Sequence, residues 1–343
     1  MISSILTRSR HILAIGAAIG GLAIAPAWAQ TDVTLALDWI VGGTHAPYFV
    51  AKDQGFYKDA GLNVTISRGF GSGDTVKRVA SGTSDFGIAD TSTIIAAMAN
   101  EKIPVKIVGM IYDKATLGII YLEESGIKKP KDLEGRSLGR SASGASVNML
   151  PAFLNANGVD RSKIKEVVVD AGTYMPILMA GRVDAVLEQS IHLSKFQKVA
   201  SEQGKKAAAM RYADYGMPAY GNAIIVSNDT AQKKGDLIKS FVEATLKGYA
   251  WALDHPDEAV GIMMKNNPEL DREATRGELA ALSDIQSSED VKQHGLSYID
   301  PKKLQATRDN VTEVLLLPRV VPMEEIYTAD FLPSEPVHVQ MSQ

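Results

Sequence analysis

Residues 35–64 constrain the fold more than any other part of the chain. They begin with a short alternating apolar run that is typical of a strand, pass through a glycine-containing polar loop, and then favour a helix. We expect this helix to begin near Thr44, with Pro47 in its first turn, and to end at Gly61 as its C-cap before a strand starts at Leu62. Strand, loop, helix and strand in this order predict half of a βαβ unit, and therefore an α/β fold.

Polar and aromatic side chains gather on the loop and the helix start of this unit. In open α/β sheets, the loop at the carboxyl end of a strand lies where ligands bind. Trp39 on its own fits a packing residue equally well, but its acidic and imidazole neighbours favour a small-ligand site, which combines flat apolar surface with a few polar groups. The predicted ligand contacts here are Asp38, Trp39, His45 and Tyr48.

Two further predicted strands end in the same way. A glycine-rich loop over 69–73 precedes a helix over 74–81, and a strand that ends at Asp90 precedes a helix over 94–100. Amides and hydroxyls at such helix starts can contact a ligand, although tight turns and helix caps also explain these residues. We predict ligand contacts from Ser72, Asp90 and Ser92.

The middle of the chain repeats this design. The small-residue loop 141–146 enters a helix, a second helix opens near Tyr174, a buried strand over 183–187 ends at Glu188, and residues 220–228 predict a crossing back to the first part of the fold. Hydroxyls and amides at a helix start form a cradle for an anion or a carbonyl group. The predicted ligand contacts from this region are Ser141, Ser143, Gly144, Tyr174, Glu188 and Asn222.

The first 29 residues have the pattern of a signal peptide. Two arginines precede an apolar stretch over 12–25, and Ala27-Trp28-Ala29 provides a small-x-small cleavage site, so we expect cleavage after Ala29. Removing Arg8 and Arg10 leaves 34 basic and 40 acidic residues, a net charge of −6. This charge disfavours a nucleic acid as partner.

The absence of cysteine limits the available chemistry. The chain cannot form disulfides, use a thiolate nucleophile or carry a lipid on cysteine, so a free periplasmic protein is expected. The 6 histidines show no H-x-x-x-H pairing, and no phosphate-binding P-loop occurs. We therefore expect no metal site, no cofactor and no catalytic residues, and predict that the protein is not an enzyme.

Several of these residues together also carry a resemblance to a known family. These residues are Asp38-Trp39, His45, Tyr48 and the run Gly55-Phe56-Tyr57, followed by Gly61-Leu62-Asn63-Val64. In this order they resemble the periplasmic binding proteins that are similar to thiamine-pyrimidine synthase. The nitrate, sulfonate and taurine receptors belong to the same group. The resemblance covers nearly all of the chain after residue 29. It implies a two-lobed periplasmic binding protein of type II, in which each lobe is a mixed sheet flanked by helices and two crossover strands act as hinges.

The resemblance and the chain length together set the expected domains. About 314 residues after the signal peptide exceed what one hydrophobic core usually holds. We expect residues 30–119 and 223–343 to form the first lobe and residues 120–222 the second.

The implied function is that of the periplasmic solute-binding component of an ABC transporter. It would capture a small, cyclic, pyrimidine-like or aromatic nutrient between its lobes and deliver it to an inner-membrane permease with its ATPase, as a monomer. The alternatives are a receptor for a small organic anion, such as a sulfonate, an aromatic carboxylate or a nitrate-like ion, and a thiamine-pyrimidine-forming enzyme. Relatives that are enzymes use a pyridoxal-linked lysine near a histidine and a cysteine-rich iron-binding run; this chain offers His45 but no cysteine.

The chain also departs from the pattern of the pyrimidine receptors. Those receptors usually carry asparagines between the tryptophan and the histidine, where this chain has Ile40-Val41-Gly42-Gly43. The departure leaves the identity of the ligand open.

Overall fold

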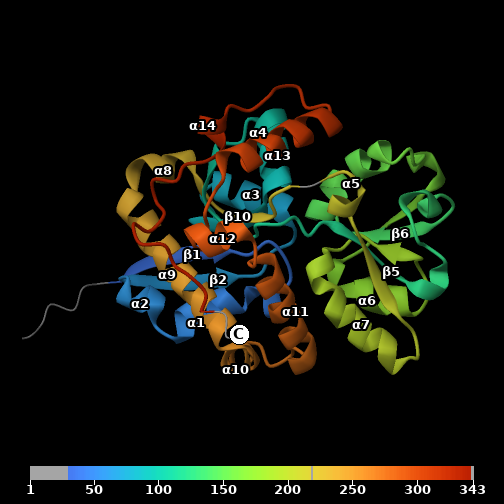
Figure 1. Cartoon of the computed structure of the whole chain (residues 1–343), viewed down its shortest axis with the longest axis horizontal. Coiled ribbons are helices and arrows are strands. Elements are labelled where there is room, and N and C mark those ends of the chain that lie inside the picture. The colour runs from blue at the N-terminus through green and yellow to red at the C-terminus, as the bar shows by residue number, and fades with distance from the viewer. Residues whose placement is uncertain (1–29, 218, 341–343) are drawn as a thin grey trace, which may run out of the picture.

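The computed structural model describes residues 30–217 and 219–340, which fold into two α/β lobes (Figure 1). The predicted signal peptide, residues 1–29, lies outside these ranges. Within them, each helix is too short or too polar to span a lipid bilayer.

A five-stranded mixed sheet forms the centre of the first lobe. Its strand order is β2-β1-β3-β10-β4. β1 pairs in parallel with β2 and β3, whereas β10 runs antiparallel to both of its neighbours. The strands are β1 (Thr31–Ala36), β2 (Leu62–Ser67), β3 (Phe86–Asp90), β4 (Val105–Met110) and β10 (Asn222–Ser227).

The second lobe repeats this arrangement with the order β7-β6-β8-β5-β9. β6 pairs in parallel with β7 and β8, and β5 runs antiparallel to β8 and β9. The strands are β5 (Gly118–Leu122), β6 (Ser137–Arg140), β7 (Lys165–Val168), β8 (Ala185–Val186) and β9 (Ala207–Arg211).

The chain crosses between the two sheets twice. The first crossing joins β4 to β5, and the second joins β9 to β10. In each sheet, the strand that directly follows a crossing runs antiparallel to its neighbours and occupies the fourth position in the strand order. This strand is β10 in the first lobe and β5 in the second. The structure thus confirms the predicted fold class. We retain 30–119 with 223–343, and 120–222, as the proposed boundaries of the lobes.

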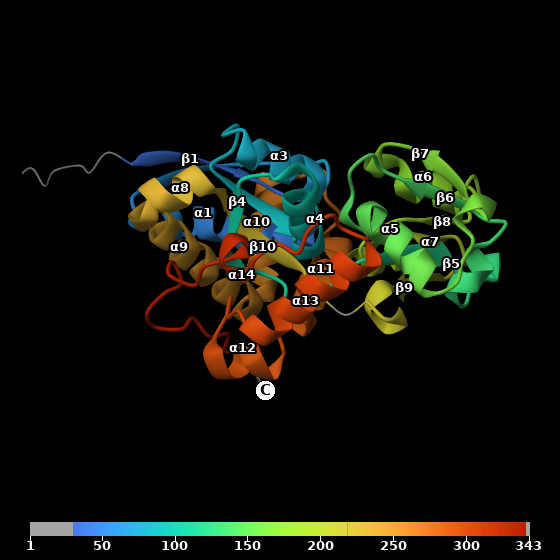
Figure 2. The same cartoon turned by 90° about the horizontal axis from the view of Figure 1, so that it is seen from above.

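Helices flank both sheets (Figures 1 and 2). Those of the first lobe are α1 (Ala46–Asp53), α2 (Phe56–Asp59), α3 (Ser72–Ala80), α4 (Thr91–Glu101), α8 (Asn228–Lys233), α9 (Gly235–Asp254), α10 (Pro256–Asn266), α11 (Arg272–Ile285), α12 (Glu289–His294), α13 (Pro301–Val314) and α14 (Met323–Ile326). Those of the second lobe are α5 (Ala145–Ala156), α6 (Tyr174–Met179) and α7 (Leu193–Glu202). α11 contacts α7 and α13 contacts α5, so both helices join the lobes.

Short 3-10 helices connect several of these elements. They are η1 (Gly43–His45), η2 (Glu123–Ser125), η3 (Pro130–Leu133), η4 (Arg161–Lys163), η5 (Ala171–Thr173), η6 (Ser190–His192) and η7 (Tyr212–Tyr215). Two of them, η1 and η6, lie where the two lobes meet.

The first helical region differs from the prediction. Instead of one helix from Thr44 to Gly61, the chain forms η1, then α1, and breaks at Gly55, whose φ of 84° places it in the left-handed region. A glycine adopts that conformation without steric cost, so the chain can turn there before α2. The predicted start near Thr44 falls in η1, and no side chain caps α1.

α9 lies closely against α1 in the core of the first lobe. Gly248 faces α1, and a Cβ atom at this position would lie 2.6 Å from Ala51 Cβ and would press on the carbonyl of Pro47. The absence of a side chain at Gly248 therefore sets how closely the two helices approach.

We predict that Gly248→Ala destabilises the fold by about 1–3 kcal/mol, because the added methyl overpacks the α1–α9 contact. Gly261→Ala is the matched control, since Gly261 also lies inside a helix but has no heavy atom within 4 Å of the added Cβ. The control should stabilise the protein by up to about 1 kcal/mol. Urea unfolding measures both free energies, and equal effects at the two positions would contradict the packing argument.

Candidate functional site

Most of the predicted ligand contacts meet between the two sheets. Asp38 and Trp39 follow β1, Ser72 begins α3, and Asp90 ends β3. From the second lobe, Glu188 follows β8 and faces them. These positions are strand ends and helix starts, so the parallel part of each sheet carries its polar side chains to the same interlobe surface.

Asp38 is the centre of the polar network on the first lobe. Its Oδ1 lies 3.0 Å from Nε2 of His45, and its Oδ2 accepts hydrogen bonds from Nδ2 of Asn222 at 2.8 Å and Nε2 of Gln189 at 3.4 Å. The Gly42 amide donates to Nδ1 of His45, so Nε2 of this ring carries the proton that Asp38 accepts. Burial alone would raise the pKa of Asp38, but His45 and Asn222 outweigh burial and lower it.

Trp39 joins the two lobes. Its Nε1 donates to Oε2 of Glu188 at 3.1 Å, and its ring centroid lies 6.3 Å from that of Tyr174. Trp39 and Glu188 are buried, with exposed fractions of 7% and 6%. Burial raises the pKa of the Glu188 carboxyl, and the charge of His192 and the nearby N–H donors offset this only in part.

The cavity around this contact is small. Its volume is about 10 Å³, and its lining comes from Asp38, Trp39, Ser72, Gly144, Ala145, Ser146, Leu187, Glu188 and Gln189. Such a space holds at most one water molecule. A ring-sized ligand can therefore enter only if Trp39 moves or the lobes separate.

The N-termini of two longer helices reach the same cavity. α3 begins at Ser72, and α5 begins at Ala145 directly after Gly144. Ser141 Oγ accepts from the Gly144 amide at 3.0 Å, and Ser72 Oγ accepts from the Asp90 amide at 3.0 Å. Both serines thus support the loops that surround the cavity.

Asp90 adds a second buried acid to the first lobe. Its Oδ1 accepts from the Thr93 amide at 3.1 Å and caps α4. Burial raises the pKa of Asp90 to about 7, against the effect of the amides in this turn. Among the described residues, Asp90 Oδ2, Ser92 Oγ and Asn222 Oδ1 are buried without a hydrogen-bond partner. Of these atoms, the oxygens of Asp90 and Asn222 leave acceptor capacity unused close to Asp38.

Three predicted contacts lie elsewhere. The structure places Tyr48 in the core of the first lobe, where its hydroxyl accepts from Tyr249 at 2.9 Å. Ser143 donates to the carbonyl of Phe70 at 2.8 Å and so links the lobes outside the small cavity. Ser92 lines a separate cavity of about 10 Å³ with apolar residues of both lobes.

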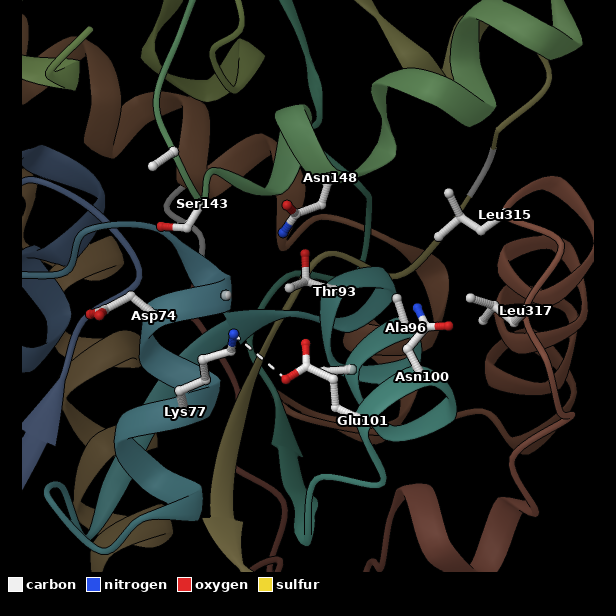
Figure 3. A pocket seen from close by; sticks show the side chains of 13 residues that line it. Asp74, Lys77, Thr93, Ala96, Asn100, Glu101, Ser143, Asn148, Leu315 and Leu317 are labelled. Atoms are coloured by element: carbon white, nitrogen blue, oxygen red, sulfur yellow. Dashed lines mark ion pairs between the residues drawn. The ribbon is translucent and has the colours of Figure 1, made fainter. Parts of the chain in front are cut away.

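Ser143 also borders a larger pocket of about 500 Å³ on one side of the interlobe region (Figure 3). Thr93, Asn100 and Asn148 line it, and Leu315 and Leu317 close one end. Lys77 and Glu101 form an ion pair across it at 3.5 Å, and both side chains are more than half exposed. This pocket is therefore open to solvent, unlike the cavity beside Trp39.

Sequence reasoning missed Gln189, His192 and Glu278. His192 Nδ1 lies 2.9 Å from Oε1 of Glu278, and Oε2 of Glu278 accepts from the Gly43 amide at 2.5 Å. Glu278 was detectable as the acidic position on the buried face of α11, which also carries Thr275, Leu279 and Leu282. Its distance in sequence from Gly43 and His192 gave no signal of the contact.

The described residues show no cluster of histidine, aspartate and glutamate that could hold a metal ion. None of the described residues that line the interlobe cavity is a lysine.

Comparison with known proteins identifies the family. The model of the family described as NMT1/THI5 like matches residues 43–259. The chain belongs to the NMT1/THI5-like family. This result confirms the resemblance recognised in the sequence.

Curated relatives of this NMT1/THI5-like protein include binding proteins and synthases. The formylaminopyrimidine-binding protein of Halalkalibacterium halodurans is 26% identical over 70% of this chain and 72% of the relative. The riboflavin-binding protein RibY of Chloroflexus aurantiacus is 27% identical over 88% and 86%. The 4-amino-5-hydroxymethyl-2-methylpyrimidine phosphate synthase of Legionella pneumophila is 26% identical over 70% and 75%.

The solved structures that resemble the protein support the fold. The alkanesulfonate-binding protein SsuA of Xanthomonas axonopodis has a TM-score of 0.66 at 15% identity and covers 88% of this chain and 99% of its own. The periplasmic aliphatic sulphonate binding protein SsuA of Escherichia coli has a TM-score of 0.62 at 16% identity, covering 88% and 98%. Both confirm the binding-protein architecture.

One prediction requires correction. We expected a protein that is not an enzyme, because the chain lacks cysteine, H-x-x-x-H pairs and a P-loop. The relatives named as pyrimidine phosphate synthases, from Legionella pneumophila, Candida albicans and Saccharomyces cerevisiae, contradict that inference. The absence of these motifs did not predict the absence of an enzymatic activity, because members of this family are named for different activities on one fold.

We predict that Asp90→Asn removes a pH dependence of stability. The pKa of Asp90 is about 7 in the folded state and near 3.8 when unfolded, so the folded state holds the extra proton and stability falls as pH rises between these values. Asparagine stays neutral and keeps the cap to Thr93. At pH 8 the variant should therefore be more stable than the wild type by roughly 4 kcal/mol, with a much smaller difference at pH 4.

Urea unfolding at the two pH values provides the measurement. Asp32→Asn is the control, because the Asp32 side chain is exposed on β1. An Asp90→Asn effect that does not change with pH would contradict the assignment.

Proposed function

We propose that this protein is the periplasmic solute-binding component of an ABC transporter, and that it captures a small cyclic nutrient carrying amino or ring N–H groups between its lobes. The observation that carries the proposal is the Trp39–Glu188 contact, in which an aromatic N–H of one lobe occupies a buried carboxylate of the other. A ligand with the same donor chemistry can replace the indole there.

Charge supports this choice of ligand. Asp38 and Glu188 line the cavity, Asp90 lies behind Ser72, and none of the described residues that line it is a lysine or an arginine. Buried carboxylates attract N–H donors and repel anions, since a like charge in a low-dielectric site costs several kcal/mol. A pyrimidine with an exocyclic amine fits both requirements, and a relative is named as a formylaminopyrimidine-binding protein.

The ligand would bind between two separated lobes, which then close around it. Trp39 and Tyr174 provide flat surface, and Asp38, Glu188 and Asn222 provide acceptors or donors at its rim. His45 acts through Asp38, whose orientation it fixes. A ligand shifts the closure equilibrium only by its preference for the closed form, and the closed form is what a membrane permease would recognise.

A second candidate ligand is a small organic anion. The N-termini of α3 and α5 both reach the cavity, and helix N-termini favour negative charge. In this case Ser72, Ser141 and the adjacent amides would hold the anion, and Glu188 would be protonated or displaced.

A third candidate is pyrimidine formation, which the names of several relatives support. Incubation with pyridoxal phosphate tests it, because a lysine imine absorbs at a characteristic wavelength. An imine band that disappears when one lysine is replaced by arginine would favour this candidate over transport.

A native mass spectrum of the protein purified from its host should show a retained mass in the range of a single-ring or two-ring compound. Denaturation should release that mass. The same compound should then bind to the emptied protein by calorimetry. If the spectrum shows only the unliganded mass, and the emptied protein binds neither aminopyrimidines nor sulfonates, the proposal fails.

We predict that Trp39→Ala weakens binding of 4-amino-5-hydroxymethyl-2-methylpyrimidine, used as the probe, by about 30-fold or more, because truncating a buried aromatic anchor costs on the order of 2 kcal/mol. Trp251→Ala is the control, since Trp251 stacks on His255 and does not line the cavity, so this change should leave affinity unchanged. Calorimetric titration measures both.

Glu188→Gln separates the first two candidates. A ligand that donates N–H groups should lose roughly 10-fold in affinity, because a hydrogen bond to a charged acceptor becomes one to a neutral amide. An alkanesulfonate should bind equally well or better, since a buried negative charge has been removed. Improved sulfonate binding together with no effect on the pyrimidine would favour the anion receptor.

A further inference from the structure

Side chains of the segment 188–192 contact Trp39, Asp38 and Glu278 of the first lobe. Glu188 accepts from Trp39, Gln189 donates to Asp38, and His192 contacts Glu278 of α11. The first two contacts belong to the proposed ligand site. The third lies outside the small cavity, so ligand contact does not account for it.

Glu278 is buried and contacts both lobes. Only 3% of its surface is exposed. Its Oε2 accepts from the Gly43 amide at 2.5 Å, and its Oε1 lies 2.9 Å from Nδ1 of His192. Gly43 opens the 3-10 helix η1 that ends at His45, the residue that orients Asp38. One carboxylate therefore connects the ligand-binding loop of the first lobe with the second lobe.

The charged groups around this contact favour the ion pair. His192 faces Glu278 on α11, Glu188 on its own segment and Lys195 on α7. Glu278 faces His192, Lys195 and the phenol of Tyr112. Asp38 of the first lobe also interacts with His192. The carboxylates Glu278, Glu188 and Asp38 outnumber the single lysine, so the environment favours a positive charge on His192.

The pKa values shift accordingly. Burial alone would lower the pKa of His192, but Glu278 outweighs burial and raises it above the ordinary value of 6.5. Burial alone would raise the pKa of Glu278, but His192 outweighs burial and lowers it below 4.5. Each partner thus stabilises the charged form of the other.

We propose that Glu278 and His192 form an ionic latch that favours the closed arrangement of the lobes and positions the ligand-binding loop. The proposal rests on the proposed function, because it assumes that closure captures a ligand. Glu278 is a positioning residue here: it acts through Gly43 and His192 and does not line the small cavity.

The latch makes closure depend on pH. The contribution of His192 is fully present below its ordinary pKa and is lost as pH rises through the raised value in the closed state. The contribution of Glu278 is present above its ordinary pKa and is lost as pH falls through the lowered value. Closure should therefore be favoured most in mildly acidic solution, near about pH 5.5, and least in alkaline solution.

Small-angle X-ray scattering of the full chain without ligand tests the latch between pH 5.5 and 9. The radius of gyration of the wild type should increase as the pH rises. Glu278→Gln keeps the size and an acceptor for Gly43 but removes the charge, so at pH 5.5 it should already have the radius that the wild type reaches at pH 9.

Glu273→Gln is the matched control. Glu273 lies on the same helix and pairs with Lys198 of the second lobe at 3.2 Å, but it is 80% exposed. Solvent screens such a pair, so this variant should follow the wild-type profile. The latch is wrong if Glu278→Gln and Glu273→Gln give the same dependence of radius on pH.

Proton NMR of the histidine ring supplies a readout that packing alone would not change. The His192 signal, assigned by its loss in His192→Gln, should titrate above pH 6.5 in the wild type and in Glu273→Gln. In Glu278→Gln it should titrate at 6.5 or below, because the carboxylate no longer offsets burial. A wild-type value at or below 6.5 overturns the proposal. Neither measurement uses a ligand, so both remain decisive if the native mass spectrum shows none.

Discussion

Buried carboxylates at the junction of the two lobes determine how the closed structure is held together. Removing a carboxylate from water costs several kcal/mol, and the cost is met only when donors surround it. Asp38 has His45, Asn222 and Gln189, Glu188 has Trp39, and Glu278 has His192 and the Gly43 amide. Because each acid has at least one of its partners on the opposite lobe, opening exposes these acids to water and closing restores the missing partner.

Much of this arrangement followed from the sequence. Polar residues at the ends of apolar runs predicted which side chains lie at the carboxyl edge of a parallel sheet, and Asp38, Trp39, Ser72 and Glu188 all line one cavity. The rule works because a parallel strand must be followed by a loop on that edge, whatever the rest of the chain does. That each lobe contains a mixed sheet followed from the family resemblance rather than from local pattern, and the fourth position of β5 and β10 was not predicted.

Contacts that depend on helix rotation or on distant pairing could not be predicted. Tyr48 is close to the loop in sequence, but its position in α1 turns the side chain toward Tyr249 and the core. Glu278 lies 235 residues after Gly43, and no local pattern indicates which loop α11 will reach. Periodicity reports which face of a helix is buried, whereas the partner of that face depends on tertiary packing.

The Trp39–Glu188 contact also limits what can bind. The indole N–H forms a hydrogen bond to a buried acid, so a competing ligand must offer a bond of at least similar strength at the same acceptor. A neutral ring with N–H groups exchanges one donor for another and leaves the net charge of the site unchanged. An anion removes the donor and adds a further negative charge beside Glu188 and Asp38, and the N-termini of α3 and α5 must offset both effects. Since a helix N-terminus contributes about 0.3–1 kcal/mol in ordinary settings, the two helices do not compensate for the repulsion unless Glu188 takes up a proton.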